Sequence, residues 1–388
     1  MKTYDWLIIG GGITGAALAY ELAKRGLSVL ILEQHAHLQG ATRFGYGGIA
    51  YWSGTNALTR QLCQEGYDRY QALPTELDAD FQFRELDLLL TIAPDQDPQQ
   101  VAASYQIFAT PPKLLEVDQA CELEPLLNPN GISGALTVKH GHISNQALAE
   151  AYIAAFLRLG GERELATVEG VVRSGDRVTG VRTSQTTYSG ANVVVCVGGW
   201  SRQFLKQAGI STRVYFTHAE LIEVPPIDLR LQTFIMPADT QRFAMEATAG
   251  EKDVAWDQPG QEVVPPILDV GVIQFQDGSL RIGQISRALT DPHAKVDPAT
   301  SAADLRNGIG QILPTLKNLS GTWHHCLVAF SCDRLPLIGP LPGVEGLFLF
   351  SGFSNPLTFV PPLAVHFATQ ATGEREALLD QMAPDRFH

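Results

Sequence analysis

Three glycines near the N-terminus are spaced to hold the phosphates of a nucleotide. Gly10, Gly12 and Gly15 fit the pattern G-x-G-x-x-G. The first permits a tight turn, the second lets the backbone approach a pyrophosphate, and the third lets a helix pack close to a strand. Glu33 follows at the distance from which a carboxylate can accept hydrogen bonds from both hydroxyls of an adenosine ribose, which disfavours NADP. The motif predicts a bound dinucleotide but does not separate FAD from NAD.

A second group of candidate ligand-binding residues lies between residues 40 and 54, in the stretch GATRFGYGGIAYWSG. Its glycines imply unusual backbone angles or close approach to a ligand. Thr42 and Arg43 add a hydroxyl and a fixed cation, and Tyr46, Tyr51 and Trp52 add aromatic surface. Because a loop of this composition is costly unless it lines a site, it is a candidate binding loop.

Composition makes several kinds of partner and compartment less favoured. The chain has 388 residues, 45% of them hydrophobic, and a net charge of −13 without a run of lysine or arginine. Nucleic acid and anionic membranes are therefore disfavoured as partners. An odd number of cysteines without C-x-x-C argues for a reducing compartment and against a disulfide framework or a zinc site. We expect a cytoplasmic protein, since the N-terminus lacks a signal-peptide cleavage site and no stretch is apolar enough to span a bilayer.

The elements that must position these residues follow from apolar periodicity. Strands are expected at 6–9, 27–32 and 192–200, and the first two flank a helix over 14–25. Helices are also predicted over 56–73, over 145–159 with Ser144 as cap, from Thr300 or Ser301, and from Pro361 and Pro362 onward. Residues 215–283 are richer in alternating β pattern. Strand–helix signals at the start, middle and end, with β-rich segments between, predict two discontinuous domains.

Six motifs occur in order along most of the chain: GGGITGAALAYELAKRG, GATRFGYGGI, ATVEGV, VVVCVGGWS, DGSLRIGQ, and CDRLPLIGPLPG followed by GLFLFSGFS. Together they resemble the FAD-dependent D-amino-acid oxidase superfamily, in particular its glycine oxidase and monomeric sarcosine oxidase branch. The resemblance implies an α/β fold with a Rossmann-like FAD-binding domain of the discontinuous GR2 type and a mixed, β-sheet-rich substrate domain. The expected FAD-binding domain is 1–82, 141–211 and 322–388, and the expected substrate-binding domain is 83–140 and 212–321.

FAD is the cofactor that the resemblance implies. Besides Gly10, Gly12, Gly15 and Glu33, it implies cofactor contacts at Ile13, Thr14, Gln34, Thr42, Arg43, Gly47, Gly48, Ile49, Val168, Cys196, Gly198, Trp200, Cys326, Gly352, Phe353, Ser354, Asn355 and Thr358.

Cys326 has two interpretations. It lies seven residues before Asp333, and in the sarcosine oxidase branch a cysteine at that spacing is bonded covalently to the flavin. The alternative is a small buried hydrophobic residue, which free cysteine often is.

The resemblance also implies a reaction, in which a hydride passes from the carbon beside an amine nitrogen to flavin N5. Arg43, Arg281 and His218 are the candidate catalytic residues. Arg281 occupies the place of a lysine that helps to activate oxygen in that branch, so oxygen or another electron acceptor stays open. His218 lies in a segment that faces the flavin in relatives, and it could be an acid–base group or a structural histidine.

The substrate pocket departs from the family pattern. Tyr46 replaces a carboxylate-binding arginine, and the lysine of the C-terminal loop is absent. The usual carboxylate clamp is therefore missing, and Arg43, Arg242 and Arg281 are candidates to replace it. The residues expected to line a more apolar pocket are Tyr46, Tyr51, Val328 and Phe359.

These observations predict an FAD-dependent oxidoreductase that oxidises a C–N bond of a small amine or amino acid. Three alternatives stay open: a flavoprotein with a non-amine substrate such as a hydroxy acid, a flavin-binding protein with little turnover, and an NAD-linked dehydrogenase.

Overall fold

The apolar strands that flank the glycine motif form the centre of the first of two β-sheets. In the computed structural model, which describes residues 2–387, β1 pairs in parallel with β2 on one side and with β10 on the other. The strands read as continuous apolar runs because both faces of the sheet are buried. The order is β16-β17-β10-β1-β2-β7, with β8 and β9 attached antiparallel beside β10. The bounds are β1 Thr3–Ile9, β2 Val29–Glu33, β7 Glu162–Leu165, β8 Val168–Ser174, β9 Arg177–Thr183, β10 Thr187–Val195, β16 Leu337–Pro340 and β17 Leu347–Ser351.

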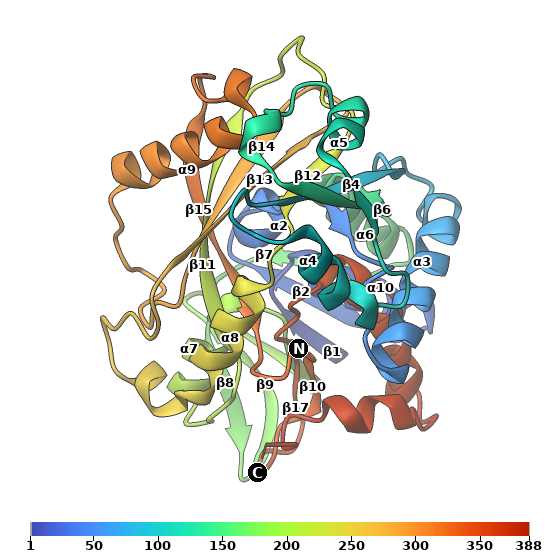
Figure 1. Ribbon diagram of the computed structural model, residues 1–388. Helices are drawn as coiled ribbons and strands as arrows, with labels where there is room; N and C mark the ends of the chain where they lie inside the picture. The colour runs from blue at the N-terminus through green and yellow to red at the C-terminus, as the bar shows by residue number, and fades with distance from the viewer. Residues whose placement is uncertain (1, 388) are drawn as a thin grey trace.

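Four helices cover one face of this sheet and share its largest core (Figure 1). They are α1 (Ile13–Lys24), α3 (Ala57–Leu77), α6 (Asn145–Arg158) and α10 (Pro356–Ala371). The opposite face packs against β8, β9 and α7 (Ser201–Gln207). The predicted α1 and α6 are confirmed, and Ser144 Oγ caps α6 by accepting from the Ala147 N–H at 3.3 Å.

The second sheet has nine strands in the order β15-β11-β14-β13-β12-β4-β6-β3, with β5 paired to β6. It lies above the first sheet in the view of Figure 1. The bounds are β3 Gly48–Ile49, β4 Arg84–Ile92, β5 Lys113–Leu115, β6 Gly134–His142, β11 Tyr215–Val224, β12 Phe234–Pro237, β13 Ile267–Gln274, β14 Leu280–Arg287 and β15 Thr322–Phe330.

The two faces of the second sheet have different surroundings. One face packs against α9 (Pro298–Ile312), with Ile222, Ile282 and Val270 among the buried residues of that core. The other face meets the short helix α2 (Gly40–Phe44), whose Phe44 stacks on His324 with ring centroids 4.5 Å apart. We call this second face the site face; its side chains include Thr217, Glu223, Arg281, Cys326 and Val328, which alternate with those on the α9 face.

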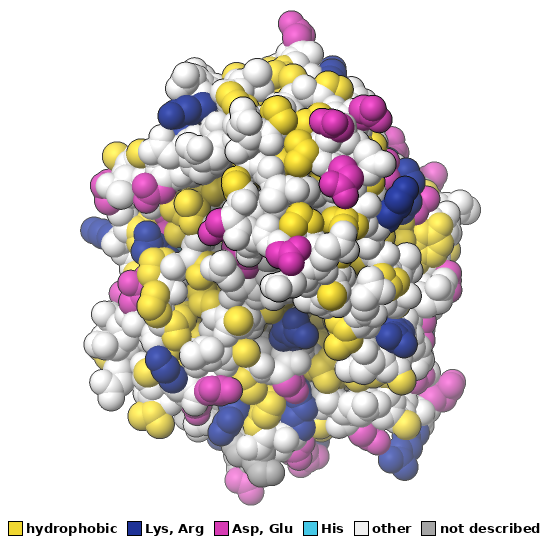
Figure 2. Space-filling view, viewed as in Figure 1, with side chains coloured by type: hydrophobic (Ala, Val, Ile, Leu, Met, Phe, Trp, Pro, Cys, Tyr) yellow, Lys and Arg dark blue, Asp and Glu magenta, His cyan; other side chains and the backbone are white. Residues whose placement is uncertain are grey.

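The remaining helical segments are α4 (Pro98–Ser104), α5 (Val117–Leu123), α8 (Gln241–Glu251) and six 3-10 turns: η1 Tyr105–Ile107, η2 Pro129–Gly131, η3 Gly198–Trp200, η4 Asp253–Asp257, η5 Pro314–Leu316 and η6 Ala377–Met382. Over residues 2–387, the helices are all too short or too polar to cross a membrane. On the face drawn in Figure 2, basic and acidic side chains are scattered and intermixed.

Three helix boundaries differ from the sequence prediction. α9 begins at Pro298 and is capped by Asp297, whose carboxylate accepts from the Ala299 N–H, rather than by Thr300 or Ser301. α10 begins at Pro356, so Pro361 and Pro362 lie inside the helix. α8 was not predicted, because its first turns carry few apolar residues and only part of the helix is buried.

The sheets also differ from the predicted domain boundaries in two places. β3 and β15 belong by sequence to segments assigned to the FAD-binding domain, yet both are hydrogen-bonded into the second sheet. Sheet membership alone does not divide the chain, so the boundaries stay a prediction.

Candidate active site

The glycine turn between β1 and α1 has almost no free space. Gly10 has φ of +100°, and a Cβ on Gly15 would lie 1.9 Å from the Gly10 carbonyl oxygen. Any side chain at position 15 would therefore push α1 away from β1. The first turn of α1 has no acidic side chain and no side-chain cap, and the Ile13 N–H donates to Thr42 Oγ1 at 3.0 Å. A helix N-terminus of this kind suits the diphosphate of a dinucleotide.

Glu33 lies at the end of β2, beside this turn. Its carboxylate accepts from the Gly11 N–H at 2.7 Å and from the His35 N–H at 2.8 Å. These bonds fix the carboxylate, and each oxygen keeps a lone pair that a ribose hydroxyl can use. Gln34 beside it is exposed, and Val168 begins β8. The fixed acid at this position fits the adenosine end of FAD.

The segment before α10 contains a buried polar atom without a partner. Within residues 2–387, Ser354 Oγ is buried and has no hydrogen-bond partner. The first turn of α10 has no acidic residue, and its N-cap Asn355 makes no capping bond through its side chain. The unsatisfied hydroxyl and the uncapped helix suit a polar group of a bound cofactor. The donors of this chain therefore fit FAD at both ends of the site.

Other predicted cofactor residues lie around the same region. Thr14 Oγ1 donates to the Cys196 carbonyl at 3.2 Å, which ties α1 to the end of β10. Thr358 Oγ1 donates to Asn355 Oδ1 at 2.9 Å. Gly352 precedes the start of α10 with φ of +82°, and Gly198 and Trp200 form η3. Phe353 packs in the core of the helical layer.

Glu223 joins two of the predicted catalytic residues. Both of its carboxylate oxygens accept from Arg43, at 2.7 and 3.0 Å, and Arg281 Nη2 lies 3.7 Å away. His324 Nε2 is 3.5 Å from the same carboxylate. Burial raises the pKa of Glu223, but the hydrogen bonds and charges of Arg43 and Arg281 outweigh it and lower the pKa overall. The cluster therefore carries two positive charges and one negative charge.

Sequence reasoning did not single out Glu223. A weak signal was present, since Glu220 and Glu223 are charged residues in the predicted β segment VYFTHAELIEV. The sequence of the strand could not show which arginines Glu223 would contact, because Arg43 comes from α2 and Arg281 from β14.

Tyr46 lies over the site face beside Arg281. Its hydroxyl would be 2.3 Å from a Cβ on Gly283, so only glycine fits beneath it. Arg281 donates to the carbonyl of Gly45, next to Tyr46 in the chain. His142 Nδ1 accepts from Arg84, so His142 Nε2 donates to the Tyr46 carbonyl at 3.1 Å. Gly47, Gly48 and Ile49 follow directly, and the last two form β3.

Cys326 is buried on the site face of β15, opposite Ala219 of β11. Burial raises the pKa of its thiol to about 12, although Arg242 and Arg281 act against it. Val328 follows on the same face, opposite Thr217. The structure therefore brings Cys326, Val328, Tyr46 and Arg281 to one region.

Arg242 reaches this region from α8. Its Nε donates to Glu246 Oε1 at 2.9 Å, and Thr217 Oγ1 donates to the same oxygen at 2.8 Å. The Arg242 side chain is 24% exposed, and its two Nη atoms make no hydrogen bond to any residue that the structure describes. Of the three arginines proposed to replace the clamp, Arg242 alone is not engaged by Glu223.

His218 is not part of this cluster. It pairs with Leu327 on β15 and lies on the α9 face, where its ring stacks on His325 at 4.4 Å. Its Nδ1 is 3.6 Å from Glu220, which also binds Arg287 at 2.8 Å. The ring is fully buried. This position argues against the predicted catalytic role, because the strand separates His218 from Arg43 and Arg281.

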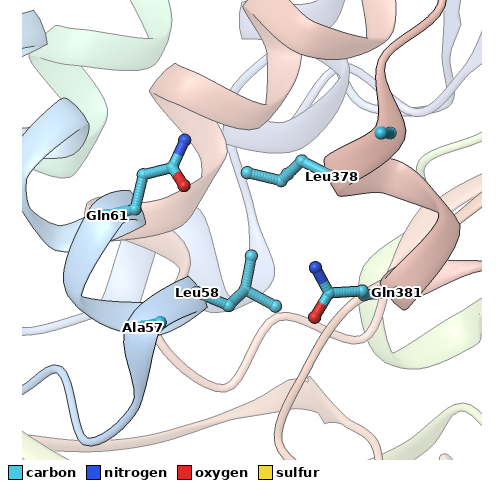
Figure 3. A pocket seen from close by; sticks show the side chains of 6 residues that line it. Ala57, Leu58, Gln61, Leu378 and Gln381 are labelled. Carbon is cyan, nitrogen blue, oxygen red and sulfur yellow. The ribbon is translucent and has the colours of Figure 1, made fainter.

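Two predicted pocket residues also lie elsewhere. Tyr51 donates to Glu85 and packs on Tyr67 of α3, with ring centroids 4.8 Å apart. Phe359 is buried in the helical core with α1 and α3. A separate hollow of about 330 Å³ lies between the start of α3 and η6 (Figure 3). Its lining contains no predicted site residue: Ala57, Leu58, Gln61, Ala377, Leu378 and Gln381.

Comparison with known proteins gives one family over almost the whole chain. The family model described as FAD dependent oxidoreductase matches residues 5–370. A glycine oxidase of Pseudomonas aeruginosa is 27% identical over 395 aligned positions, which cover 96% of each chain. Among solved structures, glycine oxidase of Geobacillus kaustophilus superposes with a TM-score of 0.81 at 22% identity, covering 100% of this chain and 99% of that one. L-proline dehydrogenase of P. horikoshii gives 0.79 at 20% identity, covering 100% and 98%.

Proposed function

The chain belongs to the family of FAD-dependent oxidoreductases, and from this premise we propose that it oxidises the C–N bond of a small amino acid or amine. The observation that carries the proposal is the likeness to a glycine oxidase over 96% of both chains. The site is compatible with it, because a buried, partly apolar face next to the glycine turn also holds several cationic side chains.

When bound, FAD supplies the chemistry by accepting a hydride from the carbon beside the nitrogen. The side chains around it position the substrate and favour negative charge. Arg43 and Arg281 hold a net positive charge around Glu223. The N-terminus of α10 adds a positive partial charge. This arrangement favours an anion in the site, as the reaction requires once a hydride has been transferred.

Arg242 is the residue that we propose to bind a substrate carboxylate. Arg43 is hydrogen-bonded to Glu223, and Arg281 donates to the Gly45 carbonyl and lies 3.7 Å from Glu223, whereas neither Nη atom of Arg242 makes a hydrogen bond within residues 2–387. Glu246 orients the guanidinium by accepting from its Nε, and Thr217 fixes the Glu246 carboxylate by donating to the same oxygen. A forked guanidinium held in this way can bind a carboxylate with two hydrogen bonds.

The test of this function is reduction of the flavin by substrate without oxygen. The purified holoenzyme is mixed anaerobically with glycine, N-methylglycine, L-proline, iminodiacetate, simple amines and glycolate, and the visible absorbance is followed. We expect amino acids to bleach the flavin. Bleaching by glycolate alone would replace the proposal with hydroxy-acid oxidation. Adding oxygen or an artificial dye to the reduced protein then identifies the electron acceptor.

The same preparation tests the state of Cys326. We expect acid precipitation to release the colour, because burial keeps the thiol protonated and the thiolate is the nucleophile. Colour that stays in the pellet, and that Cys326→Ala moves to the supernatant, would establish a covalent bond to Cys326 instead.

A further inference from the structure

The site face carries one more buried ionisable side chain, Asp269 of β13. Its neighbours Leu268 and Val270 both lie against Gly308 of α9, where an added Cβ would be 3.5 Å from Leu268 and 2.6 Å from Val270. Successive side chains of a strand point to opposite faces, so Asp269 points to the site face. β13 also shifts register against β14 between Leu268 and Gly271, and bulges of this kind re-aim side chains.

Asp269 is buried, and one of its two carboxylate oxygens has no partner among the described residues. It is 7% exposed, and its Oδ1 is buried with no hydrogen bond to any residue within 2–387. A carboxylate left in this state is costly, since it loses water and gains nothing in return. A ligand that donates to this oxygen would remove the cost.

The half-buried cation Arg242 is near the same region but does not meet Asp269. The charge of Arg242 acts on the Asp269 carboxyl, yet the two side chains form no ion pair within 4.0 Å in the part of the chain that the structure describes. Arg242 is held by Glu246 of its own helix, α8, and Thr217 of β11 donates to the same Glu246 oxygen. Two opposite charges that are held apart in this way suit a molecule that carries both charges itself.

We propose that Arg242 and Asp269 select zwitterionic amino acids, with Arg242 binding the carboxylate and Asp269 binding the amino nitrogen and accepting its proton. This inference rests on the proposed function and specifies its substrate class. The proton passes from the substrate ammonium to an Asp269 oxygen, which leaves a neutral amine, and no electrons move in that step. The neutral amine is then the species from which a hydride can leave, because its lone pair can form the C=N bond.

The groups around Asp269 fit this role. Burial and the charges of Asp239 and Glu246 raise its pKa to about 6, against the effect of Arg242. The charge of Asp269 is in turn among the causes that raise the pKa of the Tyr46 and Tyr105 phenols, after burial. The raised pKa means that Asp269 is a carboxylate above about pH 6 and is protonated below it. Because only the carboxylate can accept the proton, flavin reduction should slow as the pH falls through about 6.

The experiment measures binding to the holoenzyme by the change in the flavin spectrum, which requires no turnover. Two matched sets of probes separate the two ends of the substrate. Glycine is compared with propionate and ethylamine, and L-proline with cyclopentanecarboxylate and pyrrolidine. In the unmodified protein, an amino acid should bind roughly tenfold or more tightly than either probe that lacks one end. Equal binding of the three members of both sets, or no binding of any, would overturn the proposal.

Two substitutions then assign the ends. Asp269→Asn should weaken the binding of the amino acid by roughly tenfold or more. It should leave the affinity for the carboxylate probe within about threefold of the value in the unmodified protein. Arg242→Gln should weaken the binding of the carboxylate probe and leave the affinity for the amine probe unchanged. The matched control is Asp277→Asn, the same change in the exposed turn of the same hairpin, where Asp277 accepts from the Ser279 N–H. If Asp269→Asn fails to fold, the proposal is still tested by the affinities of Arg242→Gln and of the unmodified protein for the two sets of probes.

The pH profile separates this proposal from the proposed function. Anaerobic reduction is followed from pH 5 to 9 for the protein and for Asp269→Asn, and the variant should lose the decline below about pH 6. Suppose that amino acids reduce the flavin, but that Asp269→Asn has the same affinity for them and the same pH profile as the unmodified protein. The proposed roles of Arg242 and Asp269 would then be wrong, while the proposed function would stand. If the variants shift binding as expected but only glycolate reduces the flavin, the function is wrong while the pairing stands.

Discussion

Glu223 decides what the two site arginines can do. It accepts two hydrogen bonds from Arg43 and lies 3.7 Å from Arg281, so one carboxylate offsets part of the positive charge of both guanidinium groups. Without Glu223, two cations would remain partly buried without their common anion, which is costly.

Glu223→Gln should therefore destabilise the protein by about 2 kcal/mol, because it removes charge-assisted hydrogen bonds from a half-buried site. It should also make the flavin easier to reduce, since the site gains one unit of positive charge. Urea unfolding measures the first effect, and a redox titration of the bound flavin measures the second. Glu262→Gln, which removes a partner of Arg287 on the exposed side of the sheet, is the control. A flavin potential that is unchanged in Glu223→Gln would contradict the assignment.

At the scale of elements, α1 depends on its contact with β1. The Gly15 position is the tightest in the glycine turn, because an added Cβ would clash with the Gly10 backbone. The close approach brings the N-terminus of α1 to the place where the cofactor diphosphate is expected.

Gly15→Ala should therefore lose FAD and lower stability by roughly 1–3 kcal/mol, the usual cost of overpacking. The flavin content of the purified protein and its melting temperature are the measurements. The control is Gly170→Ala in β8, where an added Cβ would meet only the end of Arg182 at 3.8 Å. Normal flavin content in Gly15→Ala would show that α1 can move without cost to the site.

His366 connects α10 to two other segments. Both ring nitrogens lie 2.9 Å from a carboxylate, Glu65 of α3 on one side and Glu376 after α10 on the other. The hydrogen bond to Glu65 is the main cause that raises the pKa of His366, and burial acts against it. The charged form thus holds the end of the chain against α3.

This raised pKa gives a pH dependence with a definite sign. The folded state holds the proton more tightly than the unfolded state, whose histidine pKa is about 6.5. The contribution of His366 to the free energy of unfolding is therefore complete below about pH 6.5 and is lost as the pH rises through the folded pKa. His366→Gln should cost roughly 1–2 kcal/mol at pH 6 and much less at pH 9. Urea unfolding of the unmodified protein and of His366→Gln at pH 6 and pH 9 measures this loss of stability. An equal loss at the two pH values would contradict a charged His366 in the folded state.

At the scale of the molecule, the expected cofactor site lies where the two sheets meet. The glycine turn and Glu33 belong to the first sheet, and Arg281, Cys326 and Tyr46 lie on or against the second. A ligand bound between them should stabilise both halves together.

The apoprotein should therefore unfold in a single transition, and adding FAD should raise the temperature of that transition. At a free FAD concentration of about 100 times its dissociation constant, linkage predicts a gain of about 2.7 kcal/mol. Calorimetry of the apoprotein with and without FAD measures it, with NAD as the control ligand. Two separate transitions, only one of them moved by FAD, would show that the cofactor contacts one half alone.

The sequence by itself determined the local parts of this protein. The glycine motif, Glu33, the apolar strands of the first sheet and the helices α1 and α6 follow from spacing and periodicity over a few residues, and the order of motifs pointed to an FAD-dependent family. Tertiary structure decided the chemistry of the pocket. Only strand pairing shows that His218 and Cys326 point to opposite faces. Only the packing of α2 and α8 against the second sheet brings Arg43 to Glu223 and puts the charge of Arg242 within range of Asp269. The physical reason is that a shift of one residue in register reverses the face of every side chain in a strand, and register depends on partners far away in the chain.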